Sequence, residues 1–231
     1  MNIFHKKVLI TGASTGIGKA IAQYFIQKGA KVIVCGIHKP DLEVLFHKVD
    51  ITQETEITSA LLKVGAIDVL ILNSGIVHIS TLLKTSNDSF NDIFNTNVRG
   101  LFWMAKHAVP LMTKGGCILT ISSIAGLKSY EGYGIYCATK AAIISLTQTF
   151  ALELADKKIR ANCIAPGIVT TPIWNKMYGK HGTTKLKEEA KSVLMKRAGT
   201  PEEIAHAALF ACENDFVNGA VIVVDGGETA A

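Results

Sequence analysis

A tyrosine and a lysine four residues apart, Tyr136 and Lys140 in the segment Tyr-Cys-Ala-Thr-Lys, form the pair in this chain best suited to move a proton. On a helix, residues at this spacing share one face and their side chains are neighbours. An ammonium beside a phenol favours the phenolate, so Lys140 is expected to lower the pKa of Tyr136 from about 10 toward neutral pH. A phenol tuned in this way acts as a general acid or base. The same spacing also arises in an amphipathic helix with a surface lysine.

Two more polar residues are expected near this pair. Ser123 follows a predicted strand at 118–122, so its hydroxyl emerges at the edge of the sheet, where it could hold a substrate carbonyl oxygen beside Tyr136. Asn97, in Asn-Thr-Asn-Val-Arg-Gly, falls inside a predicted helix, where asparagine is a poor helix former. This misfit indicates either a local role, such as holding a water molecule, or an irregularity in the helix.

Short β-branched segments alternate with helical patterns along almost the whole chain. This alternation predicts a single α/β domain over residues 1–231, with a doubly wound sheet of about seven parallel strands. Several strand segments are continuously apolar, which is typical of strands covered on both faces. The predicted strands are 8–11, 31–35, 45–49, 69–72, 118–122, 160–165 and 221–224, and the predicted helices are 16–28, 53–64, 87–112, 136–156 and 201–212.

Two local features refine this pattern. Thr200 followed by Pro201, Glu202 and Glu203 predicts a helix start with a threonine N-cap, a proline in first position and acids in the first turn. Only about nine residues separate the second and third predicted strands, whereas a parallel crossover usually needs a dozen or more. We therefore expect a turn, or no helix at all, in that connection.

A glycine-rich segment at 11–18, Thr-Gly-Ala-Ser-Thr-Gly-Ile-Gly, joins the first strand to the first helix. Glycines let the backbone turn sharply and approach a pyrophosphate, whose charge is favoured by the helix N-terminus. Because the segment lies between a strand and a helix, it predicts dinucleotide binding. A plain tight turn is the simpler alternative.

Further polar residues follow other strands at the same edge, where ligands of open α/β sheets gather. Asp50 follows the third strand, and Asn73 begins an Asn-Ser-Gly segment after the fourth. Asp50 could accept a hydrogen bond from an adenine amino group, although a turn or a helix cap is an alternative. Asn73, taken alone, also fits an Asx turn.

The segment after the second strand, Gly-Ile-His-Lys at 36–39, bears on the choice of cofactor. An acid here would bind the ribose 2′-hydroxyl of NAD, and this acid is missing. His38 and Lys39 are candidates for contacts to the 2′-phosphate of NADP, or else belong to a solvated loop. NADP(H) is therefore slightly preferred over NAD(H).

The bulk composition argues against several classes of protein. A net charge of +5 over 231 residues, without a concentrated basic block, disfavours a nucleic-acid or membrane partner. The most basic segment, 176–197, fits a solvated loop or helix face. No apolar stretch reaches the ~20 residues of a membrane span, and the strand at 8–11 leaves no room for a signal peptide. The five cysteines show no paired spacing, so we predict buried, reduced thiols, no metal site and a cytoplasmic location.

Several motifs in one fixed order carry a resemblance to a known family. They are Thr-Gly-x-x-x-Gly-x-Gly at 11–18, Asn-Ser-Gly at 73–75, Asn97, Ser-Ser at 122–123, Tyr-x-x-x-Lys at 136–140 and Pro-Gly-x-x-x-Thr at 166–171. Together they resemble the short-chain dehydrogenases/reductases, over about residues 7–227. Arg-x-Gly-x-Pro-Glu-Glu-Ile-Ala at 197–205 and Val-Asp-Gly-Gly at 224–227 are similar to the closing segments of that family.

The resemblance implies a Rossmann fold with strand order 3-2-1-4-5-6-7 and a catalytic tetrad made by Asn97, Ser123, Tyr136 and Lys140. In the mechanism it implies, Ser123 polarises the carbonyl and Tyr136 donates the proton during reduction. Lys140 binds the nicotinamide ribose and tunes Tyr136, while Asn97 holds a water that links the lysine to solvent. The hydride passes directly between the nicotinamide and the substrate carbon.

The resemblance also implies a set of cofactor-binding residues, in which 166–171 embraces the nicotinamide carboxamide. The set comprises Gly12, Ser14, Thr15, Gly16, Ile17, Gly18, Asp50, Ile51, Asn73, Ser74, Gly75, Tyr136, Lys140, Pro166, Gly167, Val169 and Thr171. The chain departs from the family at Leu72 and Ser74, which replace residues of the usual Asn-Asn-Ala-Gly. Ile37 stands where many NADP-dependent members have arginine, and Thr15 where some have a basic residue. Both departures weaken the preference for NADP(H).

Substrate choice is expected to depend on residues 172–198. Trp174, Met177 and Tyr178 belong to an apolar set there that could close over the site as a lid. Ordinary packing of a helical flap is a compatible alternative. Tyr130 and Tyr133 are expected to line the opposite wall.

The expected function is an NAD(P)-dependent oxidoreductase that transfers a hydride between the cofactor and a ketone or secondary alcohol. The general pattern is most similar to 3-oxoacyl-(acyl-carrier-protein) reductases, which would add an acidic acyl carrier protein as a partner. A nucleotide-sensing scaffold without turnover is the other alternative. Because family members are commonly homotetramers, the helix at 136–156 is expected to form a subunit interface, or else lies wholly in the core of one chain.

Overall fold

Seven parallel strands form the central sheet of the computed structural model, which describes residues 1–230. They are β1 (Lys7–Thr11), β2 (Lys31–Gly36), β3 (Leu45–Lys48), β4 (Val69–Leu72), β5 (Gly116–Ile121), β6 (Ile159–Pro166) and β7 (Val221–Val224). All six neighbouring pairs are parallel, in the order β3-β2-β1-β4-β5-β6-β7. This confirms the predicted doubly wound sheet and its strand order.

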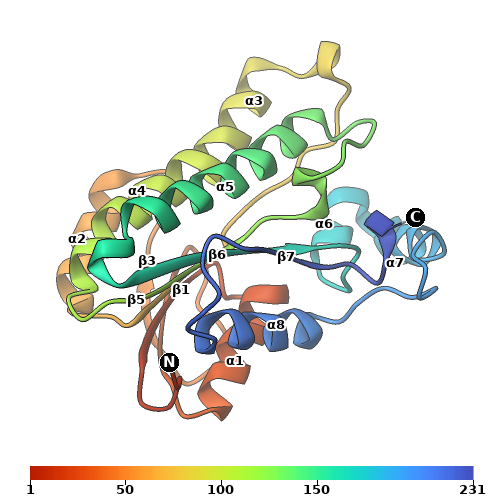
Figure 1. The fold of residues 1–231 in the computed structure, drawn as a ribbon. Helices are drawn as coiled ribbons and strands as arrows, with labels where there is room; N and C mark the ends of the chain where they lie inside the picture. The colour runs from red at the N-terminus through yellow and green to blue at the C-terminus, as the bar shows by residue number, and fades with distance from the viewer. Residues whose placement is uncertain (231) are drawn as a thin grey trace.

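Helices cover both faces of the sheet (Figure 1). α1 (Gly16–Gln27) and α8 (Pro201–Glu213) lie on one face, and α2 (Glu54–Val64), α4 (Gly100–Ala108) and α5 (Gly134–Glu153) lie on the other. α3 (Asn87–Phe94) continues the line of α4, while α6 (Ile173–Tyr178) and α7 (Gly182–Glu189) lie beyond the carboxyl ends of the strands. This is the layered arrangement that strands buried on both faces require.

Strands β1, β2, β4, β5 and β6 each contribute to two hydrophobic clusters, because side chains alternate between the two faces of the sheet. In β1, Val8 and Ile10 pack with the α1 and α8 side, whereas Leu9 packs with the α2, α4 and α5 side. All three side chains are fully buried. The continuously apolar segments of the sequence are thus explained by two cores that share one sheet.

Local signals in the sequence set several boundaries. Thr200 makes a capping box with Glu203 at the start of α8, with Pro201 in the first turn, which confirms the predicted helix start. The connection from β2 to β3 contains no helix, as its short length predicted. All five cysteines are free and buried, which confirms the prediction for the thiols.

The helical region predicted as one helix at 87–112 is interrupted in the structure. α3 ends at Phe94, a π-helical turn runs from Asn95 to Arg99, and α4 then ends at Ala108 before a short 3₁₀ turn at Val109–Leu111. A π turn widens the backbone ladder locally and is frequent at functional sites. The predicted single helix is therefore wrong, and the irregularity inferred from Asn97 is present.

Helix α5 begins at Gly134, two residues before the predicted start, so Tyr136 lies in its first turn. Within residues 1–230, α5 is the one helix whose length and apolar composition would allow it to cross a membrane, and about a third of that stretch is buried in the chain. It packs along β5 and β6. The helices α6 and α7 lie in the region expected to form a lid, and the sequence did not predict them as separate helices.

Candidate active site

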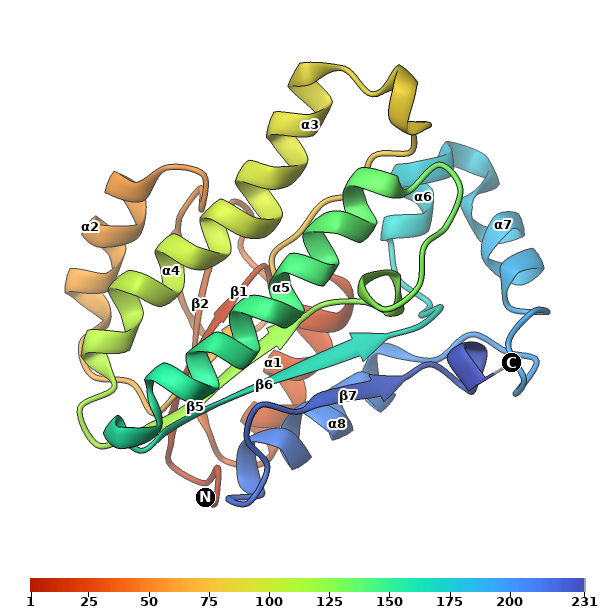
Figure 2. The same cartoon turned by 45° about the horizontal axis from the view of Figure 1, so that its top comes forward.

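A cavity of about 700 Å³ opens at the carboxyl edge of the sheet. In Figure 2 the arrows of β6 and β7 point toward the end of the molecule that carries α6, α7 and the C-terminus. Most residues predicted to bind the cofactor line the cavity. They are Gly12, Ser14, Thr15, Gly16, Ile17, Gly18, His38, Asp50, Ile51, Asn73, Ser74, Gly75, Tyr136, Lys140 and Thr171.

Other predicted residues lie outside the cavity lining, and their roles stay predictions. They are Lys39, Asn97, Ser123, Pro166, Gly167, Val169, Trp174, Met177 and Tyr178. The cavity also has lining residues that sequence reasoning missed, among them Val49, Thr52, Ile76, Val77, His78, Asp92, Asn95, Thr96, Ile121 and Lys176. Several of these residues are sequence neighbours of a predicted one. For those, the only signal in the sequence was their position near the end of a strand.

The glycine-rich turn leaves the N-terminus of α1 open to the cavity. Gly12 and Gly16 have φ angles of +68° and +58°, which other residues rarely adopt. Thr15 is the N-cap of α1, yet its side chain makes no capping hydrogen bond and the first turn carries no acid. The backbone N–H groups of this turn are thus available to an anion such as a pyrophosphate.

Asn73 fastens the end of β4 to the glycine-rich turn. Its amide nitrogen donates to the backbone oxygens of Thr11 and Gly12, at 3.2 and 2.8 Å, and its backbone N–H donates to the Thr11 hydroxyl. A Cβ on Gly18 would approach this amide nitrogen to 2.4 Å. Asn73 therefore shapes the floor of the cavity through contacts between strands, rather than through a local Asx turn.

Asp50 combines the two alternatives left open by its sequence. One carboxylate oxygen accepts from the backbone N–H and the hydroxyl of Thr52, at 2.9 and 2.8 Å, which makes an Asx-type turn. The residue also lines the cavity. At the neighbouring end of β2, His38 lines the cavity, whereas Lys39 is exposed and lies outside the lining.

Lys140 is the most unusual residue of the site, because its ammonium group is buried without a carboxylate. The side chain is 4% exposed, and Nζ donates to the backbone oxygen of Ile121 at 3.0 Å. Nζ also lies 5.5 Å from the ring centroid of Tyr136. Burial lowers the pKa of Lys140 to about 8.

The pKa of Tyr136 shifts in the direction opposite to the predicted one. Burial raises it to about 12, and the nearby Ser123 hydroxyl acts in the lowering direction without reversing the shift. The net lowering expected from Lys140 is wrong because burial, which raises the pKa, is the largest effect on Tyr136. Tyr136 is consequently a protonated phenol at neutral pH.

Ser123 lies just beyond the end of β5, in extended conformation, and caps a short 3₁₀ turn at Ile124–Gly126. Its oxygen accepts from the backbone N–H of Ala125 at 3.1 Å, so its own O–H remains a donor. The preceding Ser122 hydroxyl donates to the backbone oxygen of Lys140 at 2.7 Å. The end of β5 is thereby joined to α5 at Lys140, next to Ser123.

Asn97 is fully buried in the π turn and works as a cross-brace. Its amide accepts from the Ile76 N–H at 2.8 Å and donates to the Ile76 oxygen at 2.9 Å and to the Thr139 hydroxyl at 3.1 Å. Thr139 in turn donates to the backbone oxygen of Tyr136 at 2.8 Å. Since both amide N–H groups are used, the water-binding role predicted for Asn97 would need another atom of this residue, and it stays a prediction.

The segment after β6 carries the predicted lid and is tied back to the sheet. Gly167 donates its N–H to Val224, and a Cβ on it would meet Asp225 at 2.7 Å. Val169 is buried, and its backbone oxygen accepts from the indole nitrogen of Trp174 at 2.9 Å. This contact fixes the first turn of α6 at the rim of the site.

A buried acid is hydrogen-bonded to Tyr130, one of the tyrosines expected to line the substrate wall. Glu228, which is 9% exposed, accepts at one carboxylate oxygen from the Tyr130 hydroxyl at 2.9 Å. Its second oxygen has no hydrogen-bond partner among residues 1–230. Burial raises the pKa of Glu228, and the bond from Tyr130 opposes that shift. This pair has no local signal in the sequence, because its members lie 98 residues apart.

Comparisons with known proteins agree with this geometry. The sequence profile of the family described as enoyl-(acyl carrier protein) reductase matches residues 12–229. The chain is 37% identical over 247 residues to the 3-oxoacyl-[acyl-carrier-protein] reductase FabG of Thermotoga maritima, covering 98% of this chain and 99% of that relative. These similarities extend over nearly the whole chain, including every residue of the candidate site.

Solved structures share the fold as well. The ligand-free aldohexose dehydrogenase of Thermoplasma acidophilum superposes with a TM-score of 0.93 at 30% identity, covering 99% of this chain and 96% of that one. The structure of ElxO with NADP bound superposes with a TM-score of 0.90 at 30% identity, covering 99% and 100%. The sheet and the cavity therefore belong to a frame seen in other proteins.

The buried carboxyl of Glu228 should make stability depend on pH. Its pKa in the folded state is raised, so its contribution is fully present below the unfolded pKa of about 4.3 and is lost as pH rises through the folded value. We expect Glu228→Gln to be more stable than the unchanged protein at pH 7, by about 1 kcal/mol, with the difference shrinking toward pH 4. Denaturant unfolding at a series of pH values measures this.

The exposed Glu131, in the same loop as Tyr130, provides the control, since Glu131→Gln should leave the profile unchanged. A Glu228→Gln protein that is less stable at pH 7 would contradict the account, because the ionised carboxylate would then be favourable.

Proposed function

The chain belongs to the short-chain dehydrogenase/reductase family, and from that membership we propose that it reduces a ketone, or oxidises the matching secondary alcohol, with Tyr136 as the proton-transferring residue. Proteins of this family are oxidoreductases that act on CH–OH or C=O groups with NAD(P)(H), so the chain is an enzyme. The observation that carries the proposal is the approach of Lys140, Ser123 and Tyr136 at the end of β5, beside a cavity of about 700 Å³.

The residues around the cavity fit a nicotinamide dinucleotide. The glycine-rich turn and the open N-terminus of α1 suit the pyrophosphate, and Asp50 suits the adenosine end. Lys140 suits the ribose next to the nicotinamide, and 166–171 would hold the carboxamide. When bound, the cofactor supplies or accepts the hydride at the substrate carbon.

The protonation states support proton donation during reduction. With a pKa of about 12, Tyr136 holds its proton at neutral pH and is ready to give it to a carbonyl oxygen. Lys140, with a pKa of about 8, keeps most of its positive charge at pH 7 and favours the phenolate left behind. Ser123 has a free O–H donor to hold the same carbonyl oxygen. The three side chains thus have separate tasks at one oxygen atom.

Asn97 is proposed as a positioning residue for this chemistry. Its bonds to Ile76 and Thr139 connect the segment after β4 with the first turn of α5, which carries Tyr136. A Cβ on Gly75 would lie 3.2 Å from the Asn97 amide oxygen and 3.6 Å from the Lys140 Nζ. The brace therefore lies directly beside the proposed catalytic lysine.

For the cofactor we propose a slight preference for NADP(H) over NAD(H). The segment 36–39 at the end of β2 contains no acid, and His38 lines the cavity there. The relative ElxO was solved with NADP bound. Ile37, which is 54% exposed, takes up part of the same surface, and this keeps the expected preference small.

We further propose that α5 forms a subunit interface in a homotetramer. The helix is apolar, yet only about a third of its apolar stretch is buried within one chain. Leu152 near its end and Phe102 on the adjacent α4 are large exposed apolar side chains. Exposed apolar side chains on an apolar helix favour burial against another copy.

A second candidate function is the reduction of a 3-oxoacyl group carried by an acyl carrier protein. The observation that favours it is the similarity to the reductase FabG over 98% of this chain. The lid bears exposed lysines at positions 180, 187 and 191, which could contact an acidic carrier. Lys185, in contrast, is paired with Glu189 at 2.8 Å.

Replacing the proposed proton donor should remove turnover while leaving the cofactor bound. For Tyr136→Phe we expect a loss of at least about 100-fold in kcat, because a positioned general acid contributes on this scale. Steady-state kinetics with a reducible ketone and fluorescence titration of the reduced cofactor measure the two effects. The remote Tyr24→Phe is the matched control, and normal turnover by Tyr136→Phe would exclude Tyr136 as the donor.

Cofactor preference can be tested through thermal stability. A ligand that binds only the native state raises the melting temperature according to its concentration relative to its Kd. We expect NADPH to give a larger shift than NADH at equal concentration, and His38→Ala to reduce only the NADPH shift. A larger shift with NADH would reverse the proposed preference, and no shift with either nucleotide would oppose the enzyme proposal itself.

The carrier hypothesis predicts a dependence on salt. If an acidic carrier docks on the lid, kcat/KM for acetoacetyl-carrier should exceed that for a free acetoacetyl thioester and should fall as ionic strength rises. Lys180→Glu with Lys187→Glu should lower the value for the carrier substrate several-fold, with no effect on the free thioester. Equal kcat/KM for the two substrates at low salt would exclude carrier recognition.

A further inference from the structure

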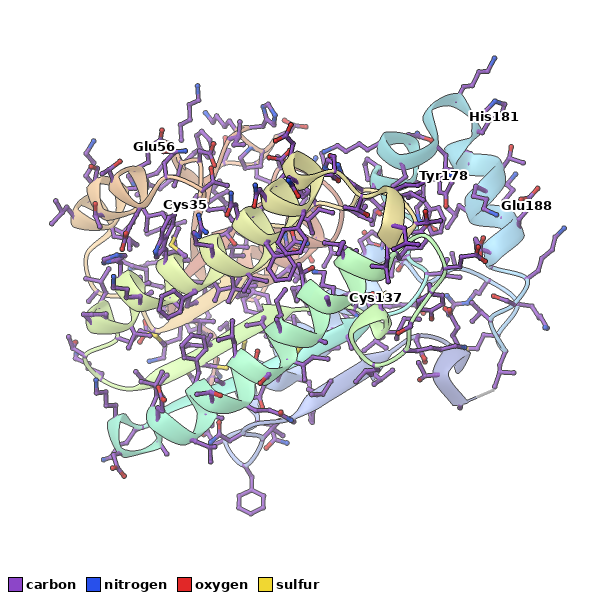
Figure 3. All side chains as sticks on the ribbon, turned by 90° about the horizontal axis from the view of Figure 1, so that it is seen from above. Cys35, Glu56, Cys137, Tyr178, His181 and Glu188 are labelled. Atoms are coloured by element: carbon purple, nitrogen blue, oxygen red, sulfur yellow. The ribbon has the colours of Figure 1, made fainter. Side chains whose placement is uncertain are left out.

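Two phenol groups meet at the boundary between the lid and the loop before α5. The hydroxyls of Tyr133 and Tyr178 lie 2.6 Å apart, so they share a hydrogen bond that joins segments 45 residues apart in the chain. Both side chains are partly buried. In Figure 3 Tyr178 lies nearer to the body of the molecule than His181 and Glu188, which mark the outer end of the lid.

This pair belongs to a row of aromatic rings that begins at the proposed proton donor. The ring centroid of Tyr133 lies 6.5 Å from that of Tyr136, in an edge-on arrangement. On the other side, Tyr178 stacks with Trp174 at 6.1 Å, and the Trp174 indole is fixed to the Val169 backbone. The two hydroxyls are therefore held in place, close to where the substrate carbonyl would lie.

The pair has hydrogen-bonding capacity left over. Each phenol can donate one hydrogen and accept others, and a single bond between them uses only one of the two O–H groups. Burial and the bond to Tyr178 both raise the pKa of Tyr133, so its hydroxyl stays protonated. Among residues 1–230 neither hydroxyl has another hydrogen-bonded side chain. One O–H donor of the pair therefore has no protein partner among the described residues.

We propose that the Tyr133–Tyr178 pair binds a hydroxyl group of the substrate, and that the preferred substrate is a short hydroxylated ketone or the corresponding diol. This inference rests on the proposed function, since it assumes that the carbonyl is reduced at Tyr136. The recognised hydroxyl is bound unchanged, so recognition adds no chemical step. The O–H group of the pair that has no protein partner can donate a hydrogen bond to the hydroxyl of such a substrate. It finds no acceptor on a plain alkyl chain.

The size of the expected substrate preference depends on the cost of leaving this O–H group without an acceptor. A site built to hydrogen-bond a substrate hydroxyl strongly rejects the analogue that lacks it, because buried polar groups are then left without partners. The Tyr133–Tyr178 pair is only partly buried, so water can satisfy part of that need and the discrimination is smaller than in a closed site. We expect a preference on the order of 100-fold in kcat/KM for the hydroxylated member of a matched pair.

The test compares ketones that differ by one hydroxyl. With the full chain and the cofactor that gives the larger thermal shift, kcat/KM is measured for 2-butanone, 3-hydroxy-2-butanone and 4-hydroxy-2-butanone. At least one hydroxylated ketone should be preferred by the unchanged protein. In Tyr133→Phe and Tyr178→Phe that preference should fall about tenfold, mainly through a higher KM, while Tyr24→Phe retains it.

The outcomes separate this inference from the function on which it rests. If all three ketones are reduced with the same kcat/KM, hydroxyl recognition is excluded and the proposed reductase stands. If the preference exists but persists in both variants, a different group binds the hydroxyl. If none of the three ketones is reduced but a 3-oxoacyl thioester is, carbonyl reduction stands and hydroxyl recognition is excluded in favour of the carrier-linked substrate. If neither kind of substrate is reduced, both proposals fail. A ratio of one on the unchanged protein is enough to overturn the inference, whether or not a variant folds.

Discussion

The site depends above all on the way α5 is locked to the end of β5. Lys140 donates from its buried ammonium to Ile121, and its own backbone oxygen accepts from Ser122. Ser123 is the next residue along the chain, and Tyr136 lies one helical turn before Lys140. Because this reciprocal pair of bonds fixes the helix on the strand, it also fixes the distance between Ser123 and Tyr136, the residues proposed to hold and to protonate the carbonyl oxygen.

Burying the Lys140 ammonium in these contacts has an electrostatic cost, and this cost indicates a functional role. An ammonium that is 4% exposed and bonded to one neutral oxygen is poorly compensated, and its lowered pKa reflects this. A hydrophobic side chain at that position would cost the fold less. The same burial keeps Tyr136 protonated. Strongly shifted groups of this kind, placed together beside a cavity, are typical of sites that move protons.

The frame of the protein could be predicted from its sequence, because several strands are apolar on both faces and the glycine-rich turn at 11–18 stands between the first strand and the first helix. Asn97 indicated the irregular helix, because asparagine is a poor helix former in a helix interior. The structure shows a π turn at this position. The direction of the Tyr136 pKa shift could not be predicted, because it depends on burial by distant segments. The bonds of Tyr133 to Tyr178 and of Tyr130 to Glu228 join loops whose meeting has no local signal.

The two halves of the site are therefore held by different kinds of interaction. The half that would carry the chemistry is held by side chains that bond to backbone atoms at the ends of the parallel strands, as from Lys140 to Ile121, so its geometry depends on the sheet. The half that would meet the substrate is held by bonds between side chains of loops, such as Tyr133 with Tyr178. Such bonds can be changed one residue at a time without disturbing the sheet. A chain can thus share 37% identity with a carrier-protein reductase along nearly its whole length and still be shaped for another carbonyl.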